Sequence, residues 1–234
     1  MQGNKKSYSK EREGFQRLRD YLASGENAVI LGEFEKAIAE VFEEYDTALR
    51  ENRFVVGGVI EIILGAVLRA AGVNVRHKGG LDTDFDLLFD DDDSSGYSVK
   101  ALLKKGQGTR LVNVMGGNTP SIERWKAATL FLLSEDVGIV YADPELRWWK
   151  EHGCECLKPT TDALQISRRC LVRFASEQSE WVIPCKLPTA DRRGTRSART
   201  ASADTASRIL IHYPRLFEHV PGLRVGEEVP GRDT

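Results

Sequence analysis

Two aspartates and a lysine stand at alternating positions of two neighbouring segments, where their chemistry can be combined. Asp84 and Asp86 alternate with apolar residues in one segment, and Ser98 and Lys100 alternate with apolar residues in the next. Because side chains alternate between the two faces of a strand, each of these pairs shares one face. An antiparallel pairing of the two segments would bring Asp86 or Asp84 beside Lys100.

Such a group suits the metal-assisted cleavage of a phosphodiester bond. Carboxylates bind Mg²⁺, which prefers oxygen ligands and keeps several waters. The ion acidifies a bound water and offsets the charge that develops on the phosphate. A lysine can orient or deprotonate that water, or stabilise the pentacovalent phosphorus. We therefore expect Mg²⁺ as the cofactor.

The elements that must position these residues follow one another as helix, three strands, helix and strand. The apolar pattern over 57–71 predicts a helix that stops at Gly72. Alternating patterns predict the three strands, and Asp93-Ser94-Ser95-Gly96 is typical of a turn between the last two. The predicted elements are a helix over 57–71, strands over 73–77, 85–89 and 97–102, a helix over 120–134 and a strand over 137–141.

The remainder of the 234 residues flanks this core in what we expect to be a single domain over 1–234. A polar segment ending at residue 23 and an amphipathic pattern over 34–49 predict a helical N-terminal part, 1–54. The extension over 143–234 is expected to serve DNA contacts or dimerisation. It contains predicted short strands at 170–174 and 181–185. The expected fold class is α/β, with a mixed central sheet flanked by helices.

This order of elements and the short Asp86…Ser98-Val99-Lys100 motif resemble the PD-(D/E)XK nuclease superfamily, which includes most type II restriction endonucleases. The resemblance covers about residues 55–142 and implies a restriction-endonuclease-like core. It implies that Asp86 is the metal-binding aspartate and that Lys100 is the catalytic lysine. Many members carry a glutamate on the first core helix, and Glu61 fits that position.

The sequence departs from the family at Ser98, where Asp or Glu is usual. Some restriction enzymes with a serine at this point recruit a glutamate from the following core helix, and Glu123 is the candidate here. The second carboxylate is therefore open between Glu61, Glu123 and Asp84.

The net charge of −2 conceals an uneven distribution of charge. Seven acids lie between residues 82 and 93, and the rest of the chain without them carries +5. A basic remainder favours a polyanionic partner, which we expect to be double-stranded DNA. The candidate DNA-binding residues are Lys104, Lys105, Arg110, Asn118, Arg124, Arg192, Arg193 and Arg196.

The sequence also excludes some classes of protein. The longest apolar run, 55–71, is interrupted by Glu61, Arg69 and glycines, so it makes a poor membrane span. The four cysteines form no CxxC pair, and nothing indicates a secreted disulfide framework. We expect free thiols and a cytoplasmic location.

The leading hypothesis is a Mg²⁺-dependent, sequence-specific DNA endonuclease of the type II restriction class. Two subunits are needed to cut both strands of a palindrome, so a homodimer is expected. One alternative is a nucleotidyltransferase, in which Gly57-Gly58 approaches a triphosphate and Asp84 and Asp86 bind Mg²⁺; a strand ending at Gly57 would favour it. Another alternative is a non-catalytic DNA-binding module with a nuclease-like core. Its support is Ser98, which stands where the family usually has a carboxylate.

Overall fold

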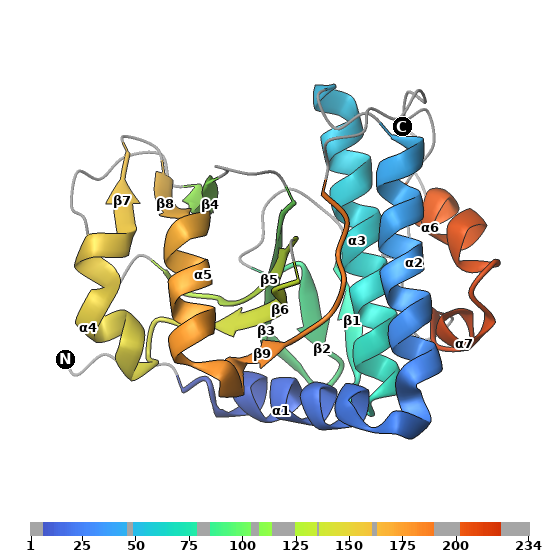
Figure 1. Cartoon of the computed structure of the whole chain (residues 1–234), viewed down its shortest axis with the longest axis horizontal. Coiled ribbons are helices and arrows are strands. Elements are labelled where there is room, and N and C mark those ends of the chain that lie inside the picture. The colour runs from blue at the N-terminus through green and yellow to red at the C-terminus, as the bar shows by residue number, and fades with distance from the viewer. Residues whose placement is uncertain are drawn as a thin grey trace, which may run out of the picture.

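A mixed sheet of six strands lies at the centre of the computed structural model, flanked by helices (Figure 1). Neighbouring strands are antiparallel, except that β3 and β5 run parallel. The predicted α/β class with a mixed central sheet is confirmed. In their order across the sheet, the strands are β1 (Val75–His77), β2 (Leu87–Phe89), β3 (Asp92–Leu102), β5 (Ala128–Leu133), β6 (Gly138–Ala142) and β9 (Val182–Ile183). The structure describes residues 7–45, 49–78, 85–103, 108–113, 125–134, 136–160, 163–189 and 202–220.

Three helices precede the sheet, as the sequence predicts, although the second covers 28–44 rather than 34–49 and the third begins at residue 50 rather than 57. They are α1 (Ser9–Ala23), α2 (Ala28–Glu44), which follows the short turn η1 (Gly25–Asn27), and α3 (Arg50–Ala70). Because α3 packs against the strands and also against α2 and α6 (Ser202–Leu210), its apolar residues are buried on nearly every side. The helix α7 (Pro214–Phe217) lies next to α6 and packs against α2 (Figure 1). Gly72 ends α3 with φ of +75°, the conformation that favours glycine at a helix C-terminus.

A second, three-stranded sheet stands apart from the first and has the order β4-β8-β7. Its strands are β4 (Gly108–Asn113), β7 (Leu157–Pro159) and β8 (Ala163–Ser167). The helix α4 (Arg147–Cys156) contacts β7, and α5 (Arg168–Glu177) contacts β8. The turn η3 (Ser179–Trp181) then leads the chain back to β9 of the central sheet. This sheet joins β4, from within the predicted core, to the C-terminal extension.

The predicted helix over 120–134 is wrong for 128–133, which form β5. All six residues of β5 are buried, because the strand lies between β3 and β6 and is covered on both faces. A strand buried on both faces reads as a continuous apolar run, which periodicity alone cannot distinguish from a buried helix. The strand expected at 137–141 is confirmed as β6.

Two smaller predictions are also wrong. The segment 170–174 is not a strand but part of α5, where Ser167 accepts a hydrogen bond from the Cys170 N–H and Leu171 and Phe174 face the core three residues apart. The segment 93–96 lies within β3 rather than in a turn, and the chain turns at 90–91 instead. Gly96 allows this pairing, because a Cβ there would collide with the carbonyl oxygen of Leu87.

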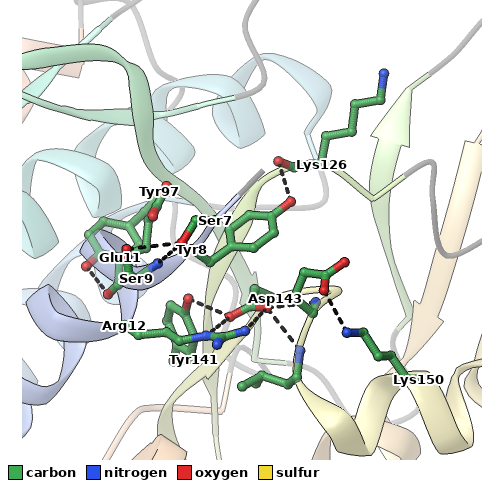
Figure 2. A network of polar contacts seen from close by, with 12 residues as sticks. Ser7, Tyr8, Ser9, Glu11, Arg12, Tyr97, Lys126, Tyr141, Asp143 and Lys150 are labelled. Atoms are coloured by element: carbon green, nitrogen blue, oxygen red, sulfur yellow. Dashed lines mark hydrogen bonds and ion pairs between the residues drawn. The ribbon is translucent and has the colours of Figure 1, made fainter. Parts of the chain in front are cut away.

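An ion pair between the partly exposed Arg12 and a buried carboxylate fixes α1 to the end of β6 (Figure 2). The fully buried Asp143 accepts hydrogen bonds from Arg12 Nε at 2.8 Å, Arg12 Nη2 at 2.9 Å and Tyr141 Oη at 2.8 Å. The backbone N–H groups of Glu145 and Leu146 donate to its Oδ1. Burial, and then the Asp143 charge, raise the pKa of Tyr141 well above its ordinary value, so its hydroxyl remains a donor.

A second buried contact attaches α1 to β3. Tyr97 Oη donates to the Glu11 carbonyl oxygen at 2.6 Å, and Ser95 Oγ donates to Glu11 Oε1 at 2.7 Å. Burial holds the pKa of Tyr97 well above its ordinary value, which keeps this hydroxyl protonated as well. Together the two contacts hold α1 across the strands on which the predicted active-site residues lie.

The cysteines correct the expectation of free thiols. Cys156, the last residue of α4, forms a disulfide with Cys170 in the first turn of α5. Sequence spacing did not reveal this pair, because the two residues meet only when α4 and α5 are packed together. Cys154 is free and exposed, and Cys185 is free and buried. Within the described ranges, we find no helix with the length and apolar character required to cross a bilayer.

Thiol titration of the native protein should reveal a single reactive cysteine, Cys154. Burial raises the pKa of Cys185 to about 12, so at pH 8 it should remain protonated and shielded. Titration with a chromogenic disulfide reagent is expected to give one thiol in the native state, two after denaturation and four after denaturation with reduction. Four thiols in the denatured, unreduced protein would contradict the Cys156–Cys170 disulfide.

Two adjacent glycines in α3 should respond in opposite ways to alanine. Gly57→Ala should raise the free energy of unfolding by up to about 1 kcal/mol, because alanine is the better helix former and its Cβ meets only ordinary contacts. Gly58→Ala should lower it by about 1–3 kcal/mol, because the new Cβ would lie 2.5 Å from Ser202 Oγ of α6. Urea unfolding measures both changes. The double variant Gly58→Ala/Ser202→Gly should recover most of the loss, and equal effects at both glycines would contradict this packing.

Candidate active site

Asp86 and Lys100 lie together where β2 begins and β3 nears its end. Lys100 Nζ is 3.4 Å from Asp86 Oδ2, and the same oxygen accepts hydrogen bonds from Ser98 Oγ at 3.0 Å and the Val99 N–H at 2.6 Å. None of the described residues donates to the other carboxylate oxygen, Oδ1. The Asp86 and Lys100 side chains are 24% and 29% exposed, so this pair can meet a ligand from solution.

Strand pairing accounts for this arrangement. The Asp86 N–H donates to the Tyr97 carbonyl oxygen at 2.9 Å, which places Asp86 opposite the start of the segment that carries Ser98 and Lys100. Ser98 and Lys100 share one face of β3, and Tyr97 points from the other face toward α1. The expected antiparallel pairing therefore brings Asp86 to Lys100, as the alternation in the sequence predicts.

Glu61 makes a different contact, with His77 at the end of β1. His77 Nε2 lies 2.7 Å from Glu61 Oε2, and the side chains are 8% and 20% exposed. His77 is paired across the strands with Leu87, and Leu87 with Tyr97, so all three side chains lie on the face that meets the helices. The carboxylate of Glu61 thus approaches the sheet from the face opposite to Ser98 and Lys100.

The Asp86–Lys100 and Glu61–His77 pairs nevertheless lie at the same end of the strands. The Lys78 N–H, next to His77, donates to the Asp86 carbonyl oxygen at 3.2 Å. His77 is also partnered with Leu87, the neighbour of Asp86. Asp86–Lys100 and Glu61–His77 are thus adjacent along the backbone, although their side chains lie on different faces.

His77 is the member of this group that sequence reasoning missed. Its Nδ1 is buried, and within the described part of the chain it has no hydrogen-bond partner. The only signal was its place in the alternation of Val73, Val75 and His77, which marks an inward-facing position but not a polar contact. A buried carboxylate on an apolar helix requires a partner, and that requirement could have directed attention to a nearby histidine.

The described residues hold no group of three His, Cys, Asp or Glu side chains that could by itself enclose a metal ion. Asp84 and Glu123, two of the candidates for the second carboxylate, lie outside the described residues. Of the predicted DNA-binding residues, Arg110 is exposed on β4. The others lie outside the described residues, namely Lys104, Lys105, Asn118, Arg124, Arg192, Arg193 and Arg196.

Removing His77 should destabilise the protein through Glu61. His77→Leu takes the hydrogen bond away from a carboxylate that is largely buried, which should cost about 1.5–3 kcal/mol in the free energy of unfolding. His77→Gln retains a donor and should recover part of that loss. A double-mutant cycle with Glu61→Gln, measured by urea unfolding, isolates the interaction. Additive losses in this cycle would contradict a direct contact.

Comparison with known proteins leaves the interpretation to the geometry of the chain itself. No family model, no curated protein and no solved structure matches this sequence or this fold. The contacts among Asp86, Ser98 and Lys100 and the order of the elements around them therefore carry the functional interpretation.

Proposed function

We propose that the protein is a Mg²⁺-dependent, sequence-specific endonuclease of double-stranded DNA, of the type II restriction class, acting as a homodimer. The observation that carries the proposal is the partly exposed Asp86–Lys100 pair, with Nζ and Oδ2 3.4 Å apart on neighbouring strands. A carboxylate and an ammonium group at one point of a sheet provide the charges that phosphodiester hydrolysis requires.

The arrangement of elements supports the same proposal. The helix α3 is followed by the antiparallel strands β1, β2 and β3, and β5 then lies parallel beside β3. This is compatible with the helix, three strands, helix and strand of the PD-(D/E)XK core, except that the fourth strand is β5 rather than the expected 137–141. Residues 120–124 of the predicted core helix lie outside the described residues.

The donor set fits a magnesium ion. Mg²⁺ is commonly bound by one or two carboxylates, with waters and substrate phosphate oxygens completing the octahedron. Asp86 offers Oδ1, and the second carboxylate is Glu61, Asp84 or Glu123. When bound, the ion would supply Lewis-acid polarisation of the phosphate and acidification of a water. Of these three, Glu61 belongs to the described residues, and because it approaches the opposite face of the sheet it would have to leave His77 and pass around the ends of the strands to share an ion with Asp86.

The side chains have separate roles in the proposed reaction. Lys100 orients the attacking water and stabilises the negative charge on the phosphoryl oxygens as the pentacovalent phosphorus forms. Ser98 Oγ and the Val99 N–H hold the Asp86 carboxylate in place through Oδ2. The water oxygen forms a bond to phosphorus and gives up a proton to solvent, the bond from phosphorus to the 3′ oxygen breaks, and that oxygen takes up a proton from solvent. The products carry a 5′-phosphate and a 3′-hydroxyl.

The geometry disfavours the nucleotidyltransferase alternative. That reading expects a strand ending at Gly57, but Gly57 and Gly58 lie inside the continuous helix α3. Gly58 serves the close approach of α6, because its missing Cβ leaves room for Ser202. A glycine pair inside a packed helix is not placed to approach a triphosphate with its backbone, as the alternative requires.

Conservative substitutions at the pair should abolish cleavage without unfolding the protein. Asp86→Asn and Lys100→Gln are each expected to reduce the rate of DNA cleavage at least about 100-fold, because each removes one charge that acts on the reacting phosphate. The measurement is the formation of discrete fragments from phage or plasmid DNA with Mg²⁺, compared with the same reaction in EDTA.

Two matched controls change the same residue types elsewhere. Asp90→Asn alters an acid in the turn between β2 and β3, which pairs with Arg69. Lys150→Gln alters a lysine of α4, which pairs with Glu145 just before that helix. Both should cut at the wild-type rate. Absence of cleavage of any DNA by the wild type, or equal cleavage by all four variants, would refute the proposal.

A further inference from the structure

Lys78 continues the pairing of β1 with β2 one residue beyond the end of β1. The register of these two strands pairs His77 with Leu87. At the next position, the Lys78 N–H donates to the Asp86 carbonyl oxygen at 3.2 Å. Lys78 therefore lies directly beside Asp86, on the side away from β3, although nothing in the sequence pattern singled it out.

The side chain of Lys78 leaves β1 on the face of the sheet that carries Lys100. Successive side chains of a strand point to opposite faces. His77 meets the face of the helices, where it contacts Glu61, so Lys78 points to the other face, which is that of Ser98 and Lys100. The burial of the two residues agrees with this, since His77 is buried and Lys78 is exposed.

Lys78 carries a positive charge that no carboxylate of the described residues offsets. The other two cations of this region are already paired, Arg76 with Asp93 and Lys100 with Asp86. Because the Asp86–Lys100 pair has no net charge, it attracts a polyanion only weakly. Among the described residues, Lys78 therefore supplies the net positive charge at this point of the sheet.

We propose that Lys78 binds a phosphate of the DNA strand next to the phosphate that is cleaved, and so holds that strand across the ends of β1, β2 and β3. This inference rests on the proposed function, because it adds a substrate contact to the same site. A lysine ammonium group is a compact point charge on a flexible stem. It suits a phosphate contact, which positions the DNA without reading its sequence.

The spacing of the strands assigns the two lysines to different phosphates. Because β2 lies between β1 and β3, Lys78 and Lys100 leave strands that are roughly 10 Å apart. Each strand of a duplex carries one phosphate per about 3.4 Å of the helix axis. Lys100 is held toward Asp86, whereas none of the described residues draws Lys78 there. Lys100 therefore serves the phosphate at Asp86, and Lys78 serves a neighbouring phosphate of the same strand.

The backbone beneath Lys78 is fixed from two directions. Its N–H is bound to the Asp86 carbonyl oxygen, and the adjacent His77 is held by Glu61 on the other face of the sheet. A fixed backbone leaves only the side chain to be ordered when a ligand binds, which lowers the entropic cost of the contact. The Glu61–His77 contact thus helps to position a substrate-binding residue from the far face.

A lysine on an edge strand can also serve to prevent pairing with another chain. β1 is an edge strand of the central sheet, but it has only three residues, and a very short edge is already a poor template for pairing. That role also requires no particular neighbour, whereas Lys78 lies beside Asp86. The two explanations differ in what they predict for the salt dependence of DNA binding.

The test measures the binding of duplex DNA without cleavage. A labelled duplex of about 30 base pairs is titrated with the full-length protein in EDTA at about 50 and about 200 mM KCl, and fluorescence anisotropy gives the Kd. Lys78→Gln should weaken binding roughly 10-fold at the lower salt, because it gives up the release of about one counterion. That loss should shrink about 3-fold to 4-fold at the higher salt, since the salt slope falls by about 0.9. Lys78→Arg keeps the charge and should bind as the wild type does.

Cleavage assays separate the role of Lys78 from that of Lys100. With Mg²⁺ and phage DNA, Lys78→Gln should raise the enzyme concentration needed for half-maximal cleavage by roughly 10-fold, because the contact serves binding. Lys100→Gln should instead lower the maximum rate, because that lysine acts on the reacting phosphate.

Lys36→Gln is the matched control, because Lys36 is an exposed lysine of α2. It should bind and cut as the wild type does, and neither substitution should change the urea midpoint, because both side chains are exposed. An unchanged Kd and salt slope for Lys78→Gln would refute the inference. Equal losses in Lys78→Gln and Lys36→Gln would also refute it, because the effect would then be one of overall charge. In both cases, discrete cleavage by the wild type with Mg²⁺ would leave the proposed function standing. A wild type that neither binds nor cuts duplex DNA would overturn both.

Discussion

The parallel pairing of β3 with β5 is the constraint on which the rest of the arrangement depends. Parallel neighbours require a crossover connection, because the chain must return to the end of the sheet at which the first strand began. Here the chain leaves β3 at Leu102 and re-enters the sheet at Ala128. On the way it forms β4, which pairs with β8 and not with the central sheet. The same connection therefore makes β3 an interior strand and starts the second sheet.

An interior position matters for the residues on β3. Along Ser98 and Lys100 the strand is hydrogen-bonded to β5 on one edge, whereas β2 pairs with it only as far as Tyr97, which leaves the Val99 N–H on the other edge to the Asp86 carboxylate. The Val99 N–H and the Ser98 hydroxyl are then fixed donors for Asp86. Preorganised donors of this kind need not reorganise when a charged ligand arrives. The helices are fixed to the same sheet, since α3 holds Glu61 against His77 and the Arg12–Asp143 ion pair holds α1 to β6.

The part of the structure that could be predicted from the sequence is the part governed by local pattern. The helices α1, α2 and α3 follow from amphipathic or apolar periodicity and from Gly72. The Asp86–Lys100 contact follows from alternation in two segments that are close in the sequence, so that little chain entropy opposes their pairing.

The remainder depends on contacts that no local pattern encodes. β5 is buried on both faces and so loses the alternation that identifies a strand. The Cys156–Cys170 disulfide and the Glu61–His77 contact arise only when separate elements are packed together. The register between β8 and its two neighbours, β4 and β7, belongs to the same class.

The pairing of β4 with β8 has a consequence for the synthesis of the chain. Asn113 ends β4, and β8 begins only at Ala163, fifty residues later. At about 5–20 residues per second, a ribosome needs roughly 3–10 seconds to make the intervening segment. During that interval β4 has no partner strand from its own sheet, and an unpaired strand can pair with another chain. The second sheet thus stays incomplete until Ser167 has been made, long after β5 and β6 have joined the central sheet, and chaperone capture would be most useful during this interval.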